Sequence, residues 1–245
     1  PYDVPPPRKW AERLQSVLLV LYLIFTRGYD GATSQAPSRG RDLCEEAIGL
    51  TALVARLIPQ EPEILGLLAM MILHDARRDA RTNSEGQFVP LERQDRSAWD
   101  HAAIERGSAI LGRALARRRP GPYQIQAAIS ALHCEASLYE ETDWPQIAAL
   151  YHELYMMQPT ETVALNRVVA VSFAFGYPPA MALLEPLLEQ RSLIDYAPFH
   201  AVHAHVLMGL GKLALAREAF ERAAQLTEPS PERDHLLERA RACIH

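Results

Sequence analysis

Proline and glycine residues divide this 245-residue chain into segments of helical length. Between these breaks, apolar side chains recur at spacings of three and four, as in the segment that contains Leu43, Ala47, Leu50, Val54 and Leu57. That spacing is typical of an amphipathic helix. Alanine and leucine together account for 69 residues, and both favour helix. The sequence therefore predicts an all-α fold and argues against a β-sandwich or barrel.

The first half is expected to form a helical N-terminal layer over residues 8–120, after a proline-rich linker at 1–7. The predicted helices are Arg8–Arg27, Arg41–Ile58, Pro62–Arg81 and Trp99–Arg119. The third of these is apolar all round in its middle, which indicates a central buried helix. Gly28 is expected to cap the first helix in the left-handed conformation, and Thr33–Gly40 to form a loop. Thr82–Ser97 is polar and is expected to form a short hairpin or an ordered loop.

Residues 121–245 are predicted to form tetratricopeptide-like pairs of helices. The predicted helices are Tyr123–Ala136, Trp144–Gln158, Glu161–Phe175, Pro179–Gln190, Pro198–Leu210, Leu213–Leu226 and Pro231–Ile244. Tyr151, Leu184 and Phe220 lie 33 and 36 positions apart, close to the period of about 34 residues of that repeat. Small residues expected at the packed positions are Ala180, Ala216 and Ala223. An irregular helical bundle is the alternative.

Charge and apolar content exclude several classes of protein. Residues 123–245 carry eight basic and 15 acidic side chains, and this net charge of −7 argues against contact with DNA phosphates. The longest apolar runs have nine and ten residues, whereas a membrane span needs about 20. The expected location is the cytoplasm. Because the chain starts with prolines and lacks an initiator Met, we expect it to be a fragment of a longer protein.

The sequence offers no complete catalytic, cofactor or metal motif. His74-Asp75 resembles the centre of a helical metal phosphohydrolase, but His74 is the first histidine and such a site needs another one upstream. His200 and His203 share one helix face, whereas His205 lies about 200° around the helix from His203. No catalytic residue, cofactor or metal is therefore expected, and a metal-dependent hydrolase is the least favoured hypothesis. Cys44 and Cys134 are interpreted as buried thiols on helix faces.

Several segments together resemble the C-terminal extension of a group of bacterial extracytoplasmic-function RNA polymerase sigma factors. They are Leu19–Tyr29, Glu61–Arg81, Gln94–Trp99, Gly121–Ala128 and Leu165–Val171, and they span essentially the whole chain in order. The family's first helix usually closes with Phe-Asn-Glu-Gly-Tyr, and Thr26-Arg27 replace the Asn-Glu pair here. Any contact that this pair makes must therefore differ in this chain.

This resemblance implies tetratricopeptide-like repeats and a regulatory role in transcription initiation through protein–protein contacts. The implied partners are the sigma core domains in cis and RNA polymerase, with a YCII-related protein as a further candidate. The alternative is a stand-alone helical-repeat module that binds proteins outside transcription. Asp95, Arg96 and Trp99 form a candidate interaction surface, because functional residues concentrate in long loops. The competing interpretation is that Asp95 and Arg96 cap and brace the helix that follows.

Overall fold

The fold is all-α, as predicted. The computed structural model describes residues 10–31, 37–85 and 87–243, and the predicted linker at 1–7 lies outside them. The described residues form eleven α-helices and several short 3₁₀ turns. Their β-type pairing is limited to one antiparallel bridge, between Thr82 and Phe88. In the described part of the chain, no helix has the length and apolar character needed to cross a membrane.

The chain divides into two compact units. Unit 1 contains Pro1–Arg81 and Arg93–Cys134, and unit 2 contains Thr82–Glu92 and Glu135–His245. The division differs from the predicted boundary at 120/121 by one helix, because the helix after Gly121 packs within unit 1. It also assigns the segment Thr82–Glu92 to the second unit rather than the first. No local pattern in the sequence indicates either of these two assignments, because both depend on tertiary packing.

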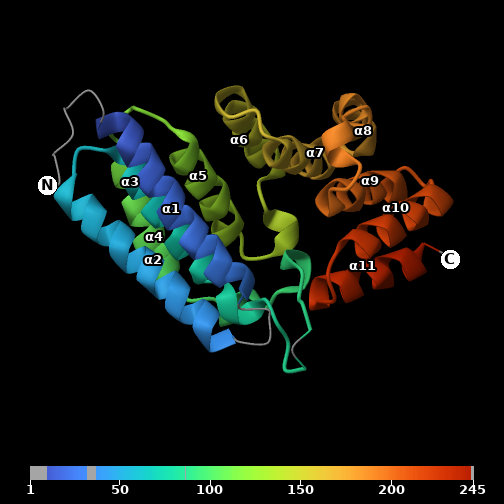
Figure 1. Cartoon of the computed structure of the whole chain (residues 1–245), viewed down its shortest axis with the longest axis horizontal. Helices are drawn as coiled ribbons and strands as arrows, with labels where there is room; N and C mark the ends of the chain where they lie inside the picture. Colours follow the sequence, from blue (N-terminus) through green and yellow to red (C-terminus); the bar gives the residue numbers. More distant parts are fainter. Residues whose placement is uncertain (1–9, 32–36, 86, 244–245) are drawn as a thin grey trace, which may run out of the picture. The chain divides into compact units, whose positions relative to one another are not determined.

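Unit 1 is built from five helices around a buried centre (Figure 1). They are α1 (Trp10–Gly31), α2 (Pro37–Leu57), α3 (Pro62–Asp75), α4 (His101–Leu115) and α5 (Pro122–Glu135). Helix α1 packs on α2, and α3 packs on α1, α2 and α4. Nine of the 14 residues of α3 are buried. The prediction of a central helix is therefore confirmed, although the α-helix ends at Asp75 and a 3₁₀ turn, Arg78–Ala80, follows it.

The predicted cap at Gly28 is wrong. Helix α1 continues to Gly31, and α2 already begins at Pro37, within the predicted loop Thr33–Gly40. A Cβ atom at Gly28 would lie 2.7 Å from the carbonyl oxygen of Gly40 and 2.9 Å from Cβ of Leu43. The absence of a side chain at Gly28 therefore lets α1 and α2 approach closely. Packing between helices, rather than a turn, explains this glycine.

The segment before α4 is an ordered loop, as predicted. It contains the Thr82–Phe88 bridge and the 3₁₀ turns Leu91–Arg93 and Arg96–Ala98. Helix α4 begins two residues later than expected, since Asp100 is its N-cap and accepts a hydrogen bond from the backbone N–H of Ala103 at 2.9 Å. A carboxylate at this position satisfies an amide that the helix itself leaves unpaired.

The described residues of unit 2 form a succession of six helices (Figure 1), and the longest connection between them contains the 3₁₀ turns Glu185–Leu187 and Arg191–Leu193. They are α6 (Trp144–Met157), α7 (Glu161–Phe175), α8 (Tyr177–Leu184), α9 (Ala197–Gly209), α10 (Leu213–Leu226) and α11 (Pro231–Ala242). Helix α8 begins earlier and is shorter than predicted, and Glu185–Leu187 forms a 3₁₀ turn after it. Gly176 and Gly211 have φ values of 90° and 74°, which a residue without a Cβ adopts easily.

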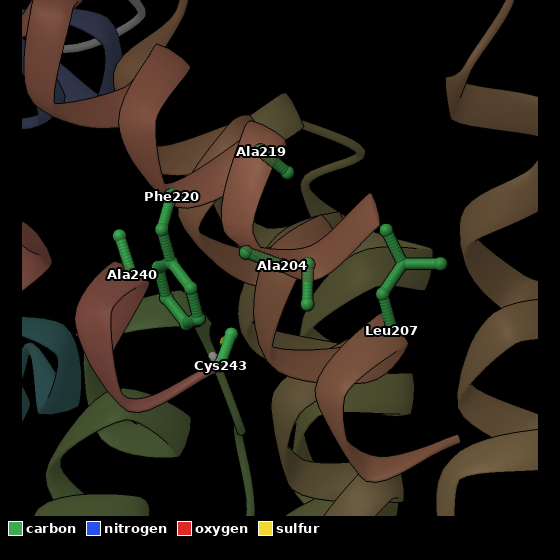
Figure 2. Close-up of a cluster of buried hydrophobic side chains, with 7 residues drawn as sticks. Ala204, Leu207, Ala219, Phe220, Ala240 and Cys243 are labelled. Carbon is green, nitrogen blue, oxygen red and sulfur yellow. The ribbon is translucent and has the colours of Figure 1, made fainter. Parts of the chain in front are cut away.

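The core of unit 2 joins α9, α10 and α11. Phe220 of α10 lies beside Ala240 and Cys243, with Ala204 and Leu207 of α9 in the same cluster (Figure 2). Among the residues predicted to pack between repeat helices, Ala180, Leu184, Ala216 and Ala223 are 0% exposed and Phe220 is 2% exposed. Tyr151 is half-buried. These positions face the interior of unit 2, and their assignment to tetratricopeptide repeats stays an interpretation.

Candidate functional site

Trp99, from the predicted interaction surface, is buried in unit 1. Its side chain is 4% exposed, and the guanidinium groups of Arg96 and Arg77 lie 4.7 and 5.8 Å from the centre of its ring. Arg96 also donates a hydrogen bond to the carbonyl oxygen of His133 in α5, at 2.6 Å. These contacts tie the loop before α4 to α5. The burial of Trp99 argues against a partner touching its ring.

Asp95 is exposed and organises the turn that contains Arg96. Its carboxylate accepts hydrogen bonds from the backbone N–H and the hydroxyl of Ser97, at 2.9 and 2.6 Å. These bonds lower the pKa of Asp95, because they stabilise its charged form. Asp95 therefore caps the 3₁₀ turn Arg96–Ala98, whereas the cap of α4 itself is Asp100. Of the predicted interaction surface Asp95, Arg96 and Trp99, only Asp95 is exposed.

His74 and Asp75 have separate partners. The ring of His74 hydrogen-bonds the hydroxyl of Ser130 at 2.9 Å and packs against Phe25 and Tyr29. Burial keeps the pKa of His74 well below its usual value, and the nearby arginines lower it further. Asp75 forms an ion pair with Arg78, yet burial raises its pKa overall. This arrangement places the two side chains in structural contacts of unit 1.

The three histidines of α9 also point to different partners. His200 contacts the carbonyl oxygen of Ile194, and His205 contacts the hydroxyl of Ser172 at 3.0 Å. His203 packs against the ring of Phe199. Burial lowers the pKa of His205 to about 4. Within the described residues, no group of three or more His, Cys, Asp or Glu side chains is arranged to hold a metal ion.

The predicted burial of the thiols is confirmed. Cys44 and Cys134 are buried thiols outside any disulfide of the described residues, and their Sγ atoms face the backbone carbonyls of Phe25 and Leu73 at 3.6 and 3.8 Å. Burial raises the pKa of Cys44 to about 11. A thiol with a raised pKa stays protonated at neutral pH and is a weak nucleophile.

Helix α1 has an exposed apolar face that the sequence analysis missed. Val17, Leu19, Val20 and Leu23 are 44–54% exposed, while the inward side of the same helix is buried. We call these four residues the α1 face. The sequence contains a signal for this face. A surface helix normally carries polar residues opposite its core side, whereas the run from 17 to 25 is apolar on both sides of the helix. Because exposed apolar residues gathered on one face are a feature of interaction surfaces, the α1 face is a candidate interaction site.

Two comparisons with known proteins found similarity, one of them confined to the first half of the chain. Residues 13–115 match a family of unknown function, DUF6596. The chain is also 42% identical over 236 residues to the uncharacterized protein R00370 of Rhizobium meliloti (strain 1021). That match includes 96% of this chain and 55% of the relative, so the chain spans about half the relative's length. No solved structure matches the chain.

Proposed function

We propose that this chain is a regulatory C-terminal extension of a bacterial extracytoplasmic-function RNA polymerase sigma factor. In this proposal it controls transcription initiation in the cytoplasm through protein–protein contacts, without a catalytic step or direct contact with DNA. The motifs between Leu19 and Val171 support the proposal through their resemblance to that family. The length of the relative supports it as well, since 45% of R00370 lies outside the match and leaves room for further domains.

The α1 face is the observation that carries the proposal. Four large apolar side chains within seven residues are half-exposed, although burying the exposed half of each would contribute about 1 kcal/mol. Helix α1 is at the same time well anchored, because Leu18, Leu21 and Phe25 are buried on its other side. A fixed helix with an open apolar stripe suits a stable protein contact. We assign this contact to the sigma core domains in cis or to RNA polymerase, with a YCII-related protein as a further candidate.

Site-specific photocrosslinking in cells tests the assignment. A benzophenone amino acid is placed at Val20 of the full-length gene product, and crosslinked peptides are identified by mass spectrometry. A matched control carries the probe at Leu115, which is 46% exposed but lies on α4. We expect Val20 to crosslink to sigma core domains or polymerase subunits, and Leu115 to give few such products. Equal products at both positions, or none to these partners from Val20, would contradict the assignment.

The alternative, a stand-alone repeat module, gives a different result in the same experiment. A protein of that kind lacks sigma domains in its coding sequence, and its crosslinks go to proteins outside the transcription apparatus. Reading the codons upstream of Pro1 separates the two hypotheses independently of the crosslinks.

A further inference from the structure

Unit 2 contains an apolar groove beside α9 and α11. It has a volume of about 530 Å³ and lies between α9, the turn from α10 to α11, and the segment that contains Phe88. Its apolar lining includes Phe88, Ala201, Leu226 and Leu236, and its acidic lining consists of Glu228 and Glu232. We call it the Phe88 groove. Pockets that bind small molecules or side chains have volumes in this range, about 300–1,000 Å³.

The wall formed by Phe88 is held in place by local hydrogen bonds. The side-chain oxygen of Asn83 accepts bonds from the backbone N–H groups of Glu85 and Gln87, at 3.0 and 2.9 Å. The side chains of Asn83 and Gln87 are joined at 2.8 Å, and Thr82 bridges to Phe88. The Phe88 ring meets the ring of His235 at 5.9 Å in an edge-on geometry. The groove is therefore formed in the structure without an added partner.

Apart from His235, the ionisable residues that line the groove are acidic. In the described residues, the carboxylates of Glu228 and Glu232 form neither an ion pair nor a hydrogen bond, whereas Asp195, two residues before the groove-lining Ala197, pairs with Arg222 at 2.7 Å. No arginine or lysine is among the residues that line the groove. The segments of unit 2 contain eight basic and 17 acidic side chains. A cationic partner would therefore meet two unpaired carboxylates within a negative field.

We propose that the Phe88 groove binds a peptide segment of a partner protein in which apolar side chains are flanked by arginine or lysine. The apolar side chains occupy the space between Phe88, Ala201 and Leu236. The flanking cations pair with Glu228 and Glu232 at the edge, where water screens each pair and limits its strength. This proposal does not depend on the sigma-factor assignment, because it concerns unit 2 and any partner of this chemistry.

Fluorescence anisotropy with a defined probe tests the proposal on the whole chain. The probe is a labelled nine-residue peptide in which leucine and phenylalanine alternate with arginine. Two reference peptides replace the arginines by glutamate or the apolar residues by serine. We expect micromolar binding of the first peptide, at least tenfold weaker binding of both reference peptides, and weaker binding as NaCl is raised from 0.1 to 1 M.

Three variants separate binding in the groove from general attraction to an acidic protein. Glu228→Gln with Glu232→Gln removes both carboxylates, and we expect about fivefold weaker binding. Ala201→Phe fills the groove without changing its charge, and we expect binding to be lost. The matched control, Glu189→Gln with Glu218→Gln, removes the same charge at exposed positions outside the groove. It is expected to bind within twofold of the parent chain. Thermal melting confirms that each variant is folded.

Each result of these binding measurements either supports or overturns the proposed peptide site. About fivefold weaker binding in the carboxylate variant and lost binding in Ala201→Phe, with binding retained in the control, support the proposal. Equal affinity for all folded variants means that the peptide binds through net charge alone, which overturns it. The absence of saturable binding to the parent chain at 1 mM peptide also overturns it. If Ala201→Phe fails to fold, the carboxylate pair and its control still decide the question.

Discussion

The carboxylate of Glu63 in α3 caps the N-terminus of α5 at Gln124. It accepts hydrogen bonds from the backbone N–H of Gln124 at 3.1 Å and from the side-chain Nε2 of the same residue at 3.0 Å. It also accepts a hydrogen bond from the backbone N–H of Tyr123. Gln124 is fully buried and donates a second bond to the carbonyl oxygen of Arg119. Two of the motifs behind the family resemblance, Glu61–Arg81 and Gly121–Ala128, therefore meet in one contact of unit 1.

Replacing Glu63 by alanine should destabilise unit 1 by about 2–3 kcal/mol. The change removes a negative charge at the start of a helix and leaves Gln124 buried with fewer partners. Urea unfolding followed by circular dichroism measures the difference, and hydrogen exchange of α5 localises it. Glu105→Ala, at an exposed position of α4, is the control and should change stability by less than about 0.5 kcal/mol. Equal stability of the two variants would show that the cap contributes little.

Two glycine-to-alanine changes should have opposite effects. A Cβ atom at Gly66 would lie 2.7 Å from the backbone nitrogen of Gln124, whereas one at Gly112 would have no neighbour within 4 Å. We expect Gly66→Ala to destabilise the protein by about 1–3 kcal/mol through overpacking. Gly112→Ala should stabilise it by about 0.5–1 kcal/mol, because alanine favours helix. Thermal melting of both variants provides the test, and a stabilising Gly66→Ala would refute the close approach of α3 and α5.

Phe220→Ala should cost about 3–5 kcal/mol, because it leaves a cavity in the core shared by α9, α10 and α11. Ala216→Trp should also destabilise unit 2, since Ala216 is 0% exposed and leaves no room for an indole ring. Leu215→Ala is the matched control, because Leu215 is 52% exposed on the same helix. If the two core variants and the control unfold at the same urea concentration, the packing described for unit 2 is incorrect.

Unit 1 should lose stability as the pH falls below about 6.5. Burial, together with Arg77 and Arg96, lowers the pKa of His133 to about 3. Between pH 6.5 and 3 the unfolded chain therefore binds a proton that the folded chain does not, and the free energy of unfolding falls by up to about 1.4 kcal/mol per pH unit. Urea unfolding at pH 7, 6 and 5 measures this slope. His133→Gln should reduce the slope, and an unchanged slope would mean that His133 is not the group responsible.

The sequence predicted the features that depend on periodicity. The all-α class, the buried α3 and the buried thiols all follow from helical spacing, a signal carried within each segment. Gly28 was misinterpreted because a glycine near an apparent helix end looks like a cap, and only the approach of Gly40 reveals its packing role. Trp99 was predicted to belong to an interaction surface because the loop around it in the sequence is polar. In the structure, Arg77 and Arg96 cover its ring.

The two candidate sites, the α1 face and the Phe88 groove, differ in whether the sequence alone could have indicated them. The α1 face could have been found by noticing apolar residues on both sides of one helix. The Phe88 groove could not, because Phe88 and His235 lie 147 positions apart and no local pattern indicates that they meet. Contacts between distant segments depend on the packing of whole helices.

Run-off transcription with the full-length gene product tests the central claim most directly. Genomic DNA of the source organism, core RNA polymerase and the purified product are combined, and the 5′ ends of the transcripts are mapped. Val20→Ser with Leu23→Ser disrupts the α1 face at positions 54% exposed, and Leu115→Ser with Met156→Ser is the matched control at positions 46% and 69% exposed. We predict discrete 5′ ends that require the product, fall at least fivefold with the α1-face variant, and persist with the control. Transcripts that do not depend on the product, or that respond equally to both variants, would contradict the account.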